Sequence, residues 1–355
     1  MPVTSVSDRR VLLTLIGTAF LLVLTAIPGA ANPGTLDPTF DGDGRVTTDL
    51  GGRDSAGDVV IQPDGKLVAA GFGAGPGEFD FAVARYNTDG SLDTSFGGDG
   101  TVTTDFNNSD DRGWDLALQP DGKIVVAGQT FVARSVGGSD LDFALVRYNS
   151  DGSLDTSFSG DGKVNTDLGA NETDAALDVA IQSDGKLVAG GYVRNLFPDP
   201  RGPADFAVAR YNADGSLDTT FGPGGSVTTD FGMDHDEASA MVIQSDGRIV
   251  AAGFAFSGTF DFGLARYNTN GTPDLGWGGD GTVLTNFGGT DSATGLALQP
   301  DGRIVAAGST NLSGSVDMAL ARYNTDGSLD NGFDGDGRVT TDFGGDDSAS
   351  DVALQ

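Results

Sequence analysis

One phrase recurs six times along this chain, and its regular spacing constrains the fold more than any other feature. The phrase is L-D-x-x-F, and two others, Q-[PS]-D-G-[KR] and R-Y-N, recur in register with it. Successive copies are 56 to 63 residues apart. Three phrases in a fixed register indicate one supersecondary unit copied along the chain. The aromatic residues that end the first phrase are Phe40, Phe96, Phe158, Phe221, Trp277 and Phe333.

Each copy contains four short runs of strand length. In the first copy they are Val46–Thr48, Asp58–Gln62, Lys66–Gly71 and Asp80–Asn87. The Pro-Asp-Gly segment at 63–65 predicts a hairpin, because Pro presets φ at the first turn position and Gly adopts the left-handed conformation that closes the turn. Four strands in a repeat of this length are typical of a propeller blade. We therefore predict an all-β β-propeller of four-stranded blades, with five complete repeats and a partial sixth. A β-sandwich or an open solenoid is the alternative.

The same phrases resemble a known bacterial repeat. F-x-G-D-G-x-V-x-T-D-[FL], D-V-A-[LI]-Q-x-D-G-K-[LI]-V-A-A-G and D-F-A-[VL]-A-R-Y-N-x-D-G-S-L-D are similar to the delta-60 repeat, over residues 34–355. The resemblance implies a tandem-repeat β-propeller of exported bacterial proteins, and it implies no defined activity. The departures are local: Gly224 and Asn286 each replace a repeated Asp, and Trp277 replaces Phe.

Residues 1–31 have the composition of a secretory signal peptide. Arg9 and Arg10 precede an uncharged apolar run that ends at Ile27, and small residues follow up to Ala31. These are the parts of a cleaved signal. A membrane anchor is the alternative, although the run is short for a span of roughly 20 residues. We predict a bacterial protein that is secreted or at the cell surface, with a mature chain that has no membrane span.

The two ends of the repeat array overlap rather than complement each other. The piece from Leu36 to Leu50 and the piece from Leu329 to Gln355 each supply the L-D-x-x-F phrase and a first strand. Neither supplies the last two strands of a sixth blade, and proteins normally avoid an unpaired sheet edge. We therefore expect a sequence cut short at the C-terminus, from a longer parent with at least six blades.

The chain is strongly acidic and has no cysteine. Its formal net charge is −31 at pH 7, and the Cys count is 0. Such a surface repels phosphate backbones and anionic lipid headgroups, so nucleic acid is not an expected partner. Without disulfides, the fold depends on core burial and on any bound metal ions.

Most of the aspartates occupy columns that recur in nearly every repeat. An Asp at the same place in every blade is more often a turn former or a cap than a catalyst. The Arg of R-Y-N shares a strand face with apolar residues, so its guanidinium must find an acceptor or reach solvent at a blade edge. The Asp columns of L-D-x-x-F and of Asp54 are its expected partners. The seven columns are those of Asp37, Asp43, Asp49, Asp54, Asp64, Asp80 and Asp89.

Calcium is the metal ion that the acidic turns would bind. The turn that contains Asn87, Asp89 and Asp93 offers several of the hard oxygen ligands that calcium prefers. Its spacing does not match the EF-hand loop, and an Asp-Gly turn without metal is the alternative. No cofactor is required by the sequence.

Catalytic motifs are scarce. The only histidine is His235, in a loop where a solvated side chain is expected, so no Ser-His-Asp set and no histidine cluster for zinc can be argued. We predict a binding or scaffold module rather than an enzyme. The alternative is a calcium-dependent hydrolase or lyase with a carboxylate site in the propeller channel. Channel carboxylates that differ from blade to blade would favour the enzyme, whereas identical turn aspartates would favour the scaffold.

Two connecting loops vary in length between repeats, and function in repeat proteins usually lies in such loops. One is long from Gln129 to Leu141 and from Tyr192 to Ala204, and the other holds Asn108, Glu172 and His235. We expect the two long loops to lie side by side on one face and to bind an extracellular glycan or peptide. Neutral drift of surface loops is the alternative. The candidate ligand-binding residues are Phe131, Arg134, Tyr192, Arg194, Phe197 and Arg201.

Overall fold

The computed structural model describes residues 10–16, 19–25, 35–75, 78–134, 138–169, 172–195, 203–232, 235–312 and 314–354. Near the N-terminus, β1 (Arg10–Ile16) pairs with β2 (Ala19–Thr25) in an antiparallel hairpin. The other strands form five separate four-stranded sheets. Within these described ranges, no helix is long and apolar enough to cross a membrane.

The five sheets are the blades of a propeller, and each uses its four strands in sequence order. Blade 1 contains β3 (Ser55–Ile61), β4 (Leu67–Ala74), β5 (Phe79–Tyr86) and β6 (Thr101–Thr104). Blade 2 contains β7 (Asp111–Leu118), β8 (Ile124–Arg134), β9 (Gly138–Tyr148) and β10 (Lys163–Thr166). Blade 3 contains β11 (Glu172–Ile181), β12 (Leu187–Asn195), β13 (Ala204–Tyr211) and β14 (Ser226–Thr229). Blade 4 contains β15 (Glu237–Ile243), β16 (Ile249–Phe256), β17 (Phe260–Tyr267) and β18 (Thr282–Thr285). Blade 5 contains β19 (Thr290–Leu298), β20 (Ile304–Asn311), β21 (Val316–Tyr323) and β22 (Arg338–Thr341).

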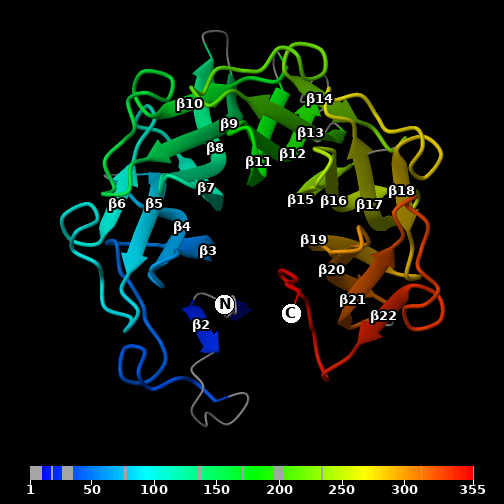
Figure 1. Ribbon diagram of the computed structural model, residues 1–355, viewed down its shortest axis with the longest axis horizontal. Coiled ribbons are helices and arrows are strands. Elements are labelled where there is room, and N and C mark those ends of the chain that lie inside the picture. The colour runs from blue at the N-terminus through cyan, green and yellow to red at the C-terminus, as the bar shows by residue number, and fades with distance from the viewer. Residues whose placement is uncertain are drawn as a thin grey trace, which may run out of the picture.

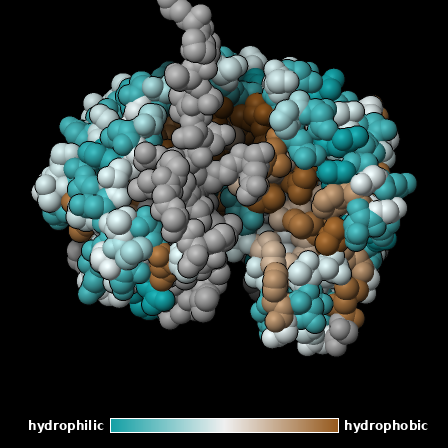
Figure 2. All heavy atoms as spheres, turned by 60° about the horizontal axis from the view of Figure 1, so that its bottom comes forward, coloured by the Kyte–Doolittle hydropathy of each residue, from teal (hydrophilic) through white to brown (hydrophobic). Residues whose placement is uncertain are grey.

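The blades stand around a common centre, with the first strand of each blade innermost and the fourth at the rim (Figure 1). The ring is open between blade 1 and blade 5, and the β1–β2 hairpin and the segment after β22 lie near this opening (Figure 1). Hydrophilic residues cover most of the outer surface in Figure 2, and apolar residues gather toward the inside. The prediction of an all-β propeller of four-stranded blades is therefore confirmed.

The strands begin and end close to the predicted runs, but the phase of the repeat was wrong. Residues 46–48 do not form a strand. The equivalent run in each later copy is the fourth strand of a blade, and it pairs with the third strand, which the preceding copy supplies. Thr104 of β6, for example, lies opposite Phe81 of β5. The reason is that the short L-D-x-x-F turn returns the chain alongside the strand it has just left. The run in the partial sixth copy therefore becomes β22 and completes blade 5. The expectation of a longer parent stays a prediction.

Each inner strand carries a β-bulge at the same place. In β7 the pairing with β8 shifts between Gly113 and Asp115, which leaves Trp114 as the extra residue. A bulge increases the local twist and leaves one backbone group unpaired. The same shift occurs in the other four inner strands. In blades 1 to 3 the residue after the bulge is an aspartate, and the bulge directs its side chain toward the neighbouring blade; Asp115, for example, accepts the Val179 N–H of blade 3.

The core lies between neighbouring blades. Phe81 and Val83 of blade 1 pack with Val126 of blade 2, and all three side chains are fully buried. Phe96, from the L-D-x-x-F phrase, is also fully buried. The backbone next to Phe96 bonds to the next blade, because Gly97 N donates to Asp151 O at 2.9 Å. The repeated phrase therefore joins consecutive blades.

The repeated arginine also joins blades, and its expected partner in L-D-x-x-F is confirmed. Arg85 Nε donates to Asp93 Oδ2 at 2.7 Å, and Arg85 Nη1 donates to the carbonyl of Ser150 in the next blade at 2.5 Å. Lys66 Nζ reaches the same Asp93 oxygen at 2.7 Å. Burial opposes ionisation of Asp93, but the Lys66 and Ser95 hydrogen bonds and the charge of Arg85 hold its pKa well below the ordinary value. The other copies of this pair are Arg147–Asp155, Arg210–Asp218, Arg266–Asp274 and Arg322–Asp330.

Candidate ligand-binding face

Both variable connections lie at the same end of the ring. The second strand of each blade runs toward this end and the third strand leaves it, since the two are antiparallel. The fourth strand runs back to it before the chain enters the next blade. We call this end the loop face, defined by the turns after β4, β8, β12, β16 and β20 and the links after β6, β10, β14 and β18. The Asp-Gly turns lie at the opposite end.

The predicted binding residues lie on the loop face where the structure describes them. Phe131 is 36% exposed and belongs to β8, while Tyr192 and Arg194 are half-buried in β12. Arg134 ends β8, but its side chain is not among the described ones, and Phe197 and Arg201 lie outside the described residues. The segment from Gln129 to Leu141 is not a long loop. It is mostly an extension of the β8–β9 hairpin, in which Arg134 pairs with Gly138.

The two variable connections meet between blades 3 and 4. Ala204 and His235 form a parallel bridge, and Asp236 N donates to Ala204 O at 2.7 Å. Arg194 Nη2 lies 2.6 Å from His235 Nε2 and 3.0 Å from Glu237 Oε1. The expectation of a solvated loop histidine was therefore wrong, because only 27% of the His235 side chain is exposed.

Aromatic rings surround this polar contact. The Arg194 guanidinium lies 5.3 Å from the centre of the Tyr192 ring. The rings of His235 and Phe254 are parallel within 4°, with centroids 6.1 Å apart. Burial, followed by the nearby Glu237 charge, raises the pKa of the Tyr192 hydroxyl. We call Tyr192, Arg194, His235, Glu237 and Phe254 the blade 3–4 cluster.

A second aromatic cluster lies between blades 1 and 2. Phe72 contacts Phe79 and Trp114 edge to face, at centroid distances of 5.0 and 5.6 Å. Arg112 lies over the rings of Phe79 and Phe72, at 4.9 and 5.4 Å. Both ends of the Arg112 fork bind Asp110 at 2.9 Å. The sequence interpretation missed these residues, although the position after the glycine of the second strand varies visibly: it is Phe72, Gln129, Tyr192, Phe254 and Ser309 in the five blades.

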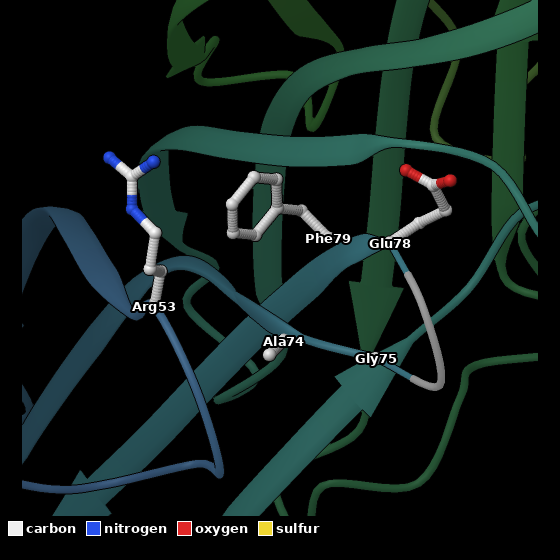
Figure 3. A pocket seen from close by; sticks show the side chains of 5 residues that line it. All are labelled: Arg53, Ala74, Gly75, Glu78 and Phe79. Atoms are coloured by element: carbon white, nitrogen blue, oxygen red, sulfur yellow. The ribbon is translucent and has the colours of Figure 1, made fainter.

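A pocket of about 320 Å³ opens beside this blade 1–2 cluster. Its lining comes from both variable connections of blade 1: Arg53 lies before β3, and Glu78 and Phe79 lie at the start of β5. Figure 3 shows the Phe79 ring between Arg53 and Glu78, so an apolar surface is flanked by one positive and one negative side chain. Ala74 and Gly75 complete the lining.

The three turn residues proposed as metal ligands are engaged by protein groups. Asn87 Nδ2 donates to Ser91 Oγ at 3.1 Å. Asp89 Oδ1 accepts the Ser91 N–H at 3.0 Å and the Ser91 hydroxyl at 2.6 Å. Asp93 is held by Lys66 and Arg85, as described above. These contacts are those of a turn and an ion pair.

The inner strands bring three other aspartates together near the centre of the ring. Asp58 and Asp178 both lie within hydrogen-bonding reach of Asp115. Each carboxyl group also accepts a backbone N–H from the next inner strand; Val179 N, for example, donates to Asp115 Oδ2 at 2.7 Å. Blades 4 and 5 have Ala240 and Gly295 at this position. The column thus differs from blade to blade, but each carboxyl group also caps a neighbouring strand.

Burial dominates the ionisation of this trio. It raises the pKa of Asp58 to about 6 and that of Asp178 to about 7. Burial and the charges of Asp178 and Asp58 raise the pKa of Asp115 well above its ordinary value. Among the three carboxyl groups, the raised pKa makes Asp115 the one that favours its protonated form, in which it can donate a hydrogen bond to a neighbour.

Comparison with known families identifies the repeat. The description "Domain of unknown function (DUF5122) beta-propeller" matches residues 62–96, 119–158, 182–221, 244–276 and 299–333, more than half of the chain. The chain belongs to the DUF5122 β-propeller family. Each matched segment runs from the Q-[PS]-D-G-[KR] turn to the L-D-x-x-F phrase or close to its end, so the family shares the hairpin and the blade-joining elements.

Solved structures resemble this DUF5122 propeller only distantly. A polysaccharide lyase described as an ulvan lyase aligns with a TM-score of 0.45 and 12% identity, over 76% of this chain and 64% of that one. A xylan β-1,4-xylosidase from Bacillus halodurans aligns at 0.38 and 13%, over 76% and 53%. An exo-1,5-α-L-arabinanase from a bovine ruminal metagenomic library aligns at 0.37 and 12%, over 81% and 100%. The chain thus spans about half to two thirds of the first two structures, and the likeness concerns the fold alone. No curated protein matches the sequence.

Proposed function

We propose that this DUF5122 propeller is an exported bacterial binding module that holds an extracellular glycan on its loop face. The observation that carries the proposal is the presence of two aromatic–arginine clusters on that face, in a chain whose blades are otherwise built alike. The same proposal includes three further points: the repeat is related to the delta-60 repeat, residues 1–31 are a signal peptide, and the protein is extracellular.

A glycan suits these clusters better than an acidic peptide does. Arg112 is already paired with Asp110, and Arg194 with Glu237, so neither arginine has a charge left uncompensated for an anionic ligand. Aromatic rings beside such fixed polar groups match the surface of a sugar ring, which has apolar faces and a rim of hydroxyl groups. The pocket next to Phe79 has a volume that accommodates a small saccharide.

The test compares glycan and peptide arrays for the full chain and for two variants, Phe79→Ala and Tyr192→Ala. Binding to a glycan should weaken at least tenfold in each variant, since truncating an aromatic contact residue costs about 1–3 kcal/mol. Leu284→Ala is the matched control, because Leu284 is 42% exposed but lies in an outer strand and belongs to neither aromatic cluster. Equal glycan binding by all four proteins, or binding to acidic peptides alone, would contradict the proposal.

The second candidate is a calcium-dependent hydrolase or lyase, and the Asp58–Asp115–Asp178 trio is the observation that favours it. The column differs from blade to blade, and a carboxyl group whose pKa is raised by burial can act as a general acid. Against it, all three carboxyl groups cap backbone N–H groups of neighbouring strands. Cleavage of an extracellular polysaccharide by the full chain, abolished in Asp115→Asn, would favour this candidate over the binding module.

A further inference from the structure

The loop-face ends of the blades repeat a cluster of three aspartates. In each cluster the first Asp comes from the third strand of a blade, the second follows its fourth strand, and the third begins the next inner strand or the segment equivalent to it. One carboxylate oxygen from each residue lies within 4.8 Å of the other two. In the described part of the chain the clusters are Asp80–Asp105–Asp111, Asp142–Asp167–Asp174, Asp205–Asp230–Asp236 and Asp317–Asp342–Asp347.

In most repeats, protein donors satisfy both oxygens of the third aspartate. Asp111 Oδ1 accepts the hydroxyl of Thr130, which lies opposite it in the sheet, at 2.5 Å. Asp291, the equivalent aspartate in the inner strand of blade 5, accepts the hydroxyl of Thr310 in the same way. Asp236 Oδ1 accepts a backbone N–H instead, from Phe256 at 2.9 Å. These carboxylates are therefore held by the fold itself.

Asp174 is different because Val193 lies opposite it in the sheet. Its Oδ2 accepts the Leu168 N–H at 2.6 Å, but its Oδ1 has no hydrogen-bond donor among the residues that the structure describes. The residue is 0% exposed. A buried oxygen without a donor is costly, and a bound water or ion is one way in which native proteins satisfy such a group.

The geometry around Asp174 suits one calcium ion. Calcium takes six to eight oxygen ligands at about 2.3–2.6 Å, and three carboxylate oxygens that lie within 4.8 Å of one another can reach one such ion together. Asp142 and Asp174 are buried and Asp167 is exposed, so the ion would keep a solvent side for water ligands. Burial, with the charges of Asp140, Asp167 and Asp142, raises the pKa of Asp174 to about 8, and a cation would reverse that effect.

We propose that the junction between blades 2 and 3 is a calcium site formed by Asp142, Asp167 and Asp174, and that the equivalent clusters bind calcium far more weakly. The selectivity comes from Val193, which withholds the hydroxyl that Thr130 supplies to Asp111. This inference does not depend on the loop face binding a glycan.

The test is calcium titration of the chelator-treated full chain by calorimetry, up to about 10 mM, tenfold above the weakest dissociation constant of roughly 1 mM for extracellular calcium modules. The wild type should bind one calcium ion in this range. Asp174→Asn should weaken binding at least tenfold, because it removes a ligand charge yet keeps an oxygen to accept the Leu168 N–H. Asp111→Asn is the matched control and should bind calcium like the wild type.

Val193→Thr provides an independent variant that preserves every charge and nearly the same side-chain volume. Its hydroxyl should bond Asp174 Oδ1, as Thr130 does with Asp111, and lower calcium affinity at least threefold. Equal losses in Asp111→Asn and Asp174→Asn would overturn the proposed selectivity. No binding by the wild type, or unchanged binding in Val193→Thr and Asp174→Asn, would overturn the site itself.

Discussion

At the scale of single residues, the aspartates outside the junction clusters include three kinds that differ in their surroundings. Asp93 and its copies lie beside Arg and Lys side chains, which hold their pKa values below the ordinary range. Exposed turn aspartates such as Asp89 accept the N–H two residues later. The Asp58–Asp115–Asp178 trio is buried among like charges, so its pKa values are raised. The same side chain therefore stabilises the fold at different pH values in different places.

The trio predicts that stability falls as the pH rises from about 4 to about 7. A carboxyl group whose pKa is higher in the folded state binds more protons when folded, so unfolding becomes easier as pH passes through that window. The folded-state values of about 6 for Asp58 and about 7 for Asp178 define its upper end. We expect the melting temperature to decline across this range, measured by circular dichroism in buffers of equal ionic strength.

Asp115→Asn should flatten this decline. Asparagine does not titrate and can still accept the Val179 N–H, so the variant removes the proton that Asp115 gains on folding without losing the cap. Asp301→Asn, at an exposed turn, should leave the slope unchanged. A pH dependence that is the same in the wild type and in Asp115→Asn would show that the trio does not titrate in this way.

At the scale of elements, the bulge in each inner strand requires a glycine opposite it in the second strand. The bulge moves a carbonyl of the inner strand toward the second strand, so that a β-carbon at Gly128 would lie only 1.9 Å from Arg112 O. The other four blades have Gly71, Gly191, Gly253 and Gly308 at this position, each within 2.0 Å of the equivalent carbonyl. The bulge therefore explains why a glycine recurs at this position of every second strand.

Gly128→Ala should therefore destabilise the propeller by roughly 2–4 kcal/mol, because overpacking against a backbone cannot relax by a rotamer change. The measurement is the urea midpoint of the variant relative to the wild type. Gly276→Ala is the control, since a β-carbon there would meet only Asp274 Oδ1 at an ordinary 3.4 Å. Equal midpoints for the two variants would show that the bulge can move.

At the scale of the whole molecule, blades are joined by contacts that repeat around the ring. The Thr104 hydroxyl of blade 1 lies 2.7 Å from the Tyr148 hydroxyl of blade 2, and the Arg85 guanidinium reaches the next Asp-Gly turn. Because these contacts are the same at each junction, they build the ring without giving any blade a special role. The distinctive chemistry lies on the loop face and near the centre, where the columns vary.

Export also belongs to this scale. The protein expressed in a bacterial host should be recovered outside the cytoplasm with a mass that begins near Asn32, because a signal peptidase would cleave after Ala31. Replacing Arg9 and Arg10 with Gln should reduce export, since the basic start of a signal guides its insertion. Exported protein that retains residues 1–31 would instead favour the membrane-anchor alternative.

The sequence by itself determined most of the strands, the turns and the propeller, because each depends on local chemistry repeated in register. The Pro-Asp-Gly turn is one example: Gly65 has a φ of 87°, which its position in the phrase already required. The sequence left two aspartate columns as partners of the repeated arginine, and the tertiary structure decided between them: Arg85 pairs with Asp93, whereas Asp54 accepts the Leu50 N–H. Tertiary structure decided which blade each strand joins. A repeating sequence does not show where one structural unit ends and the next begins, so the grouping of strands into blades could not be predicted from it. Tertiary structure also decided the sites. Val193 becomes informative only when it lies opposite Asp174, and Arg194 only when the fold brings it to His235, a residue 41 positions away.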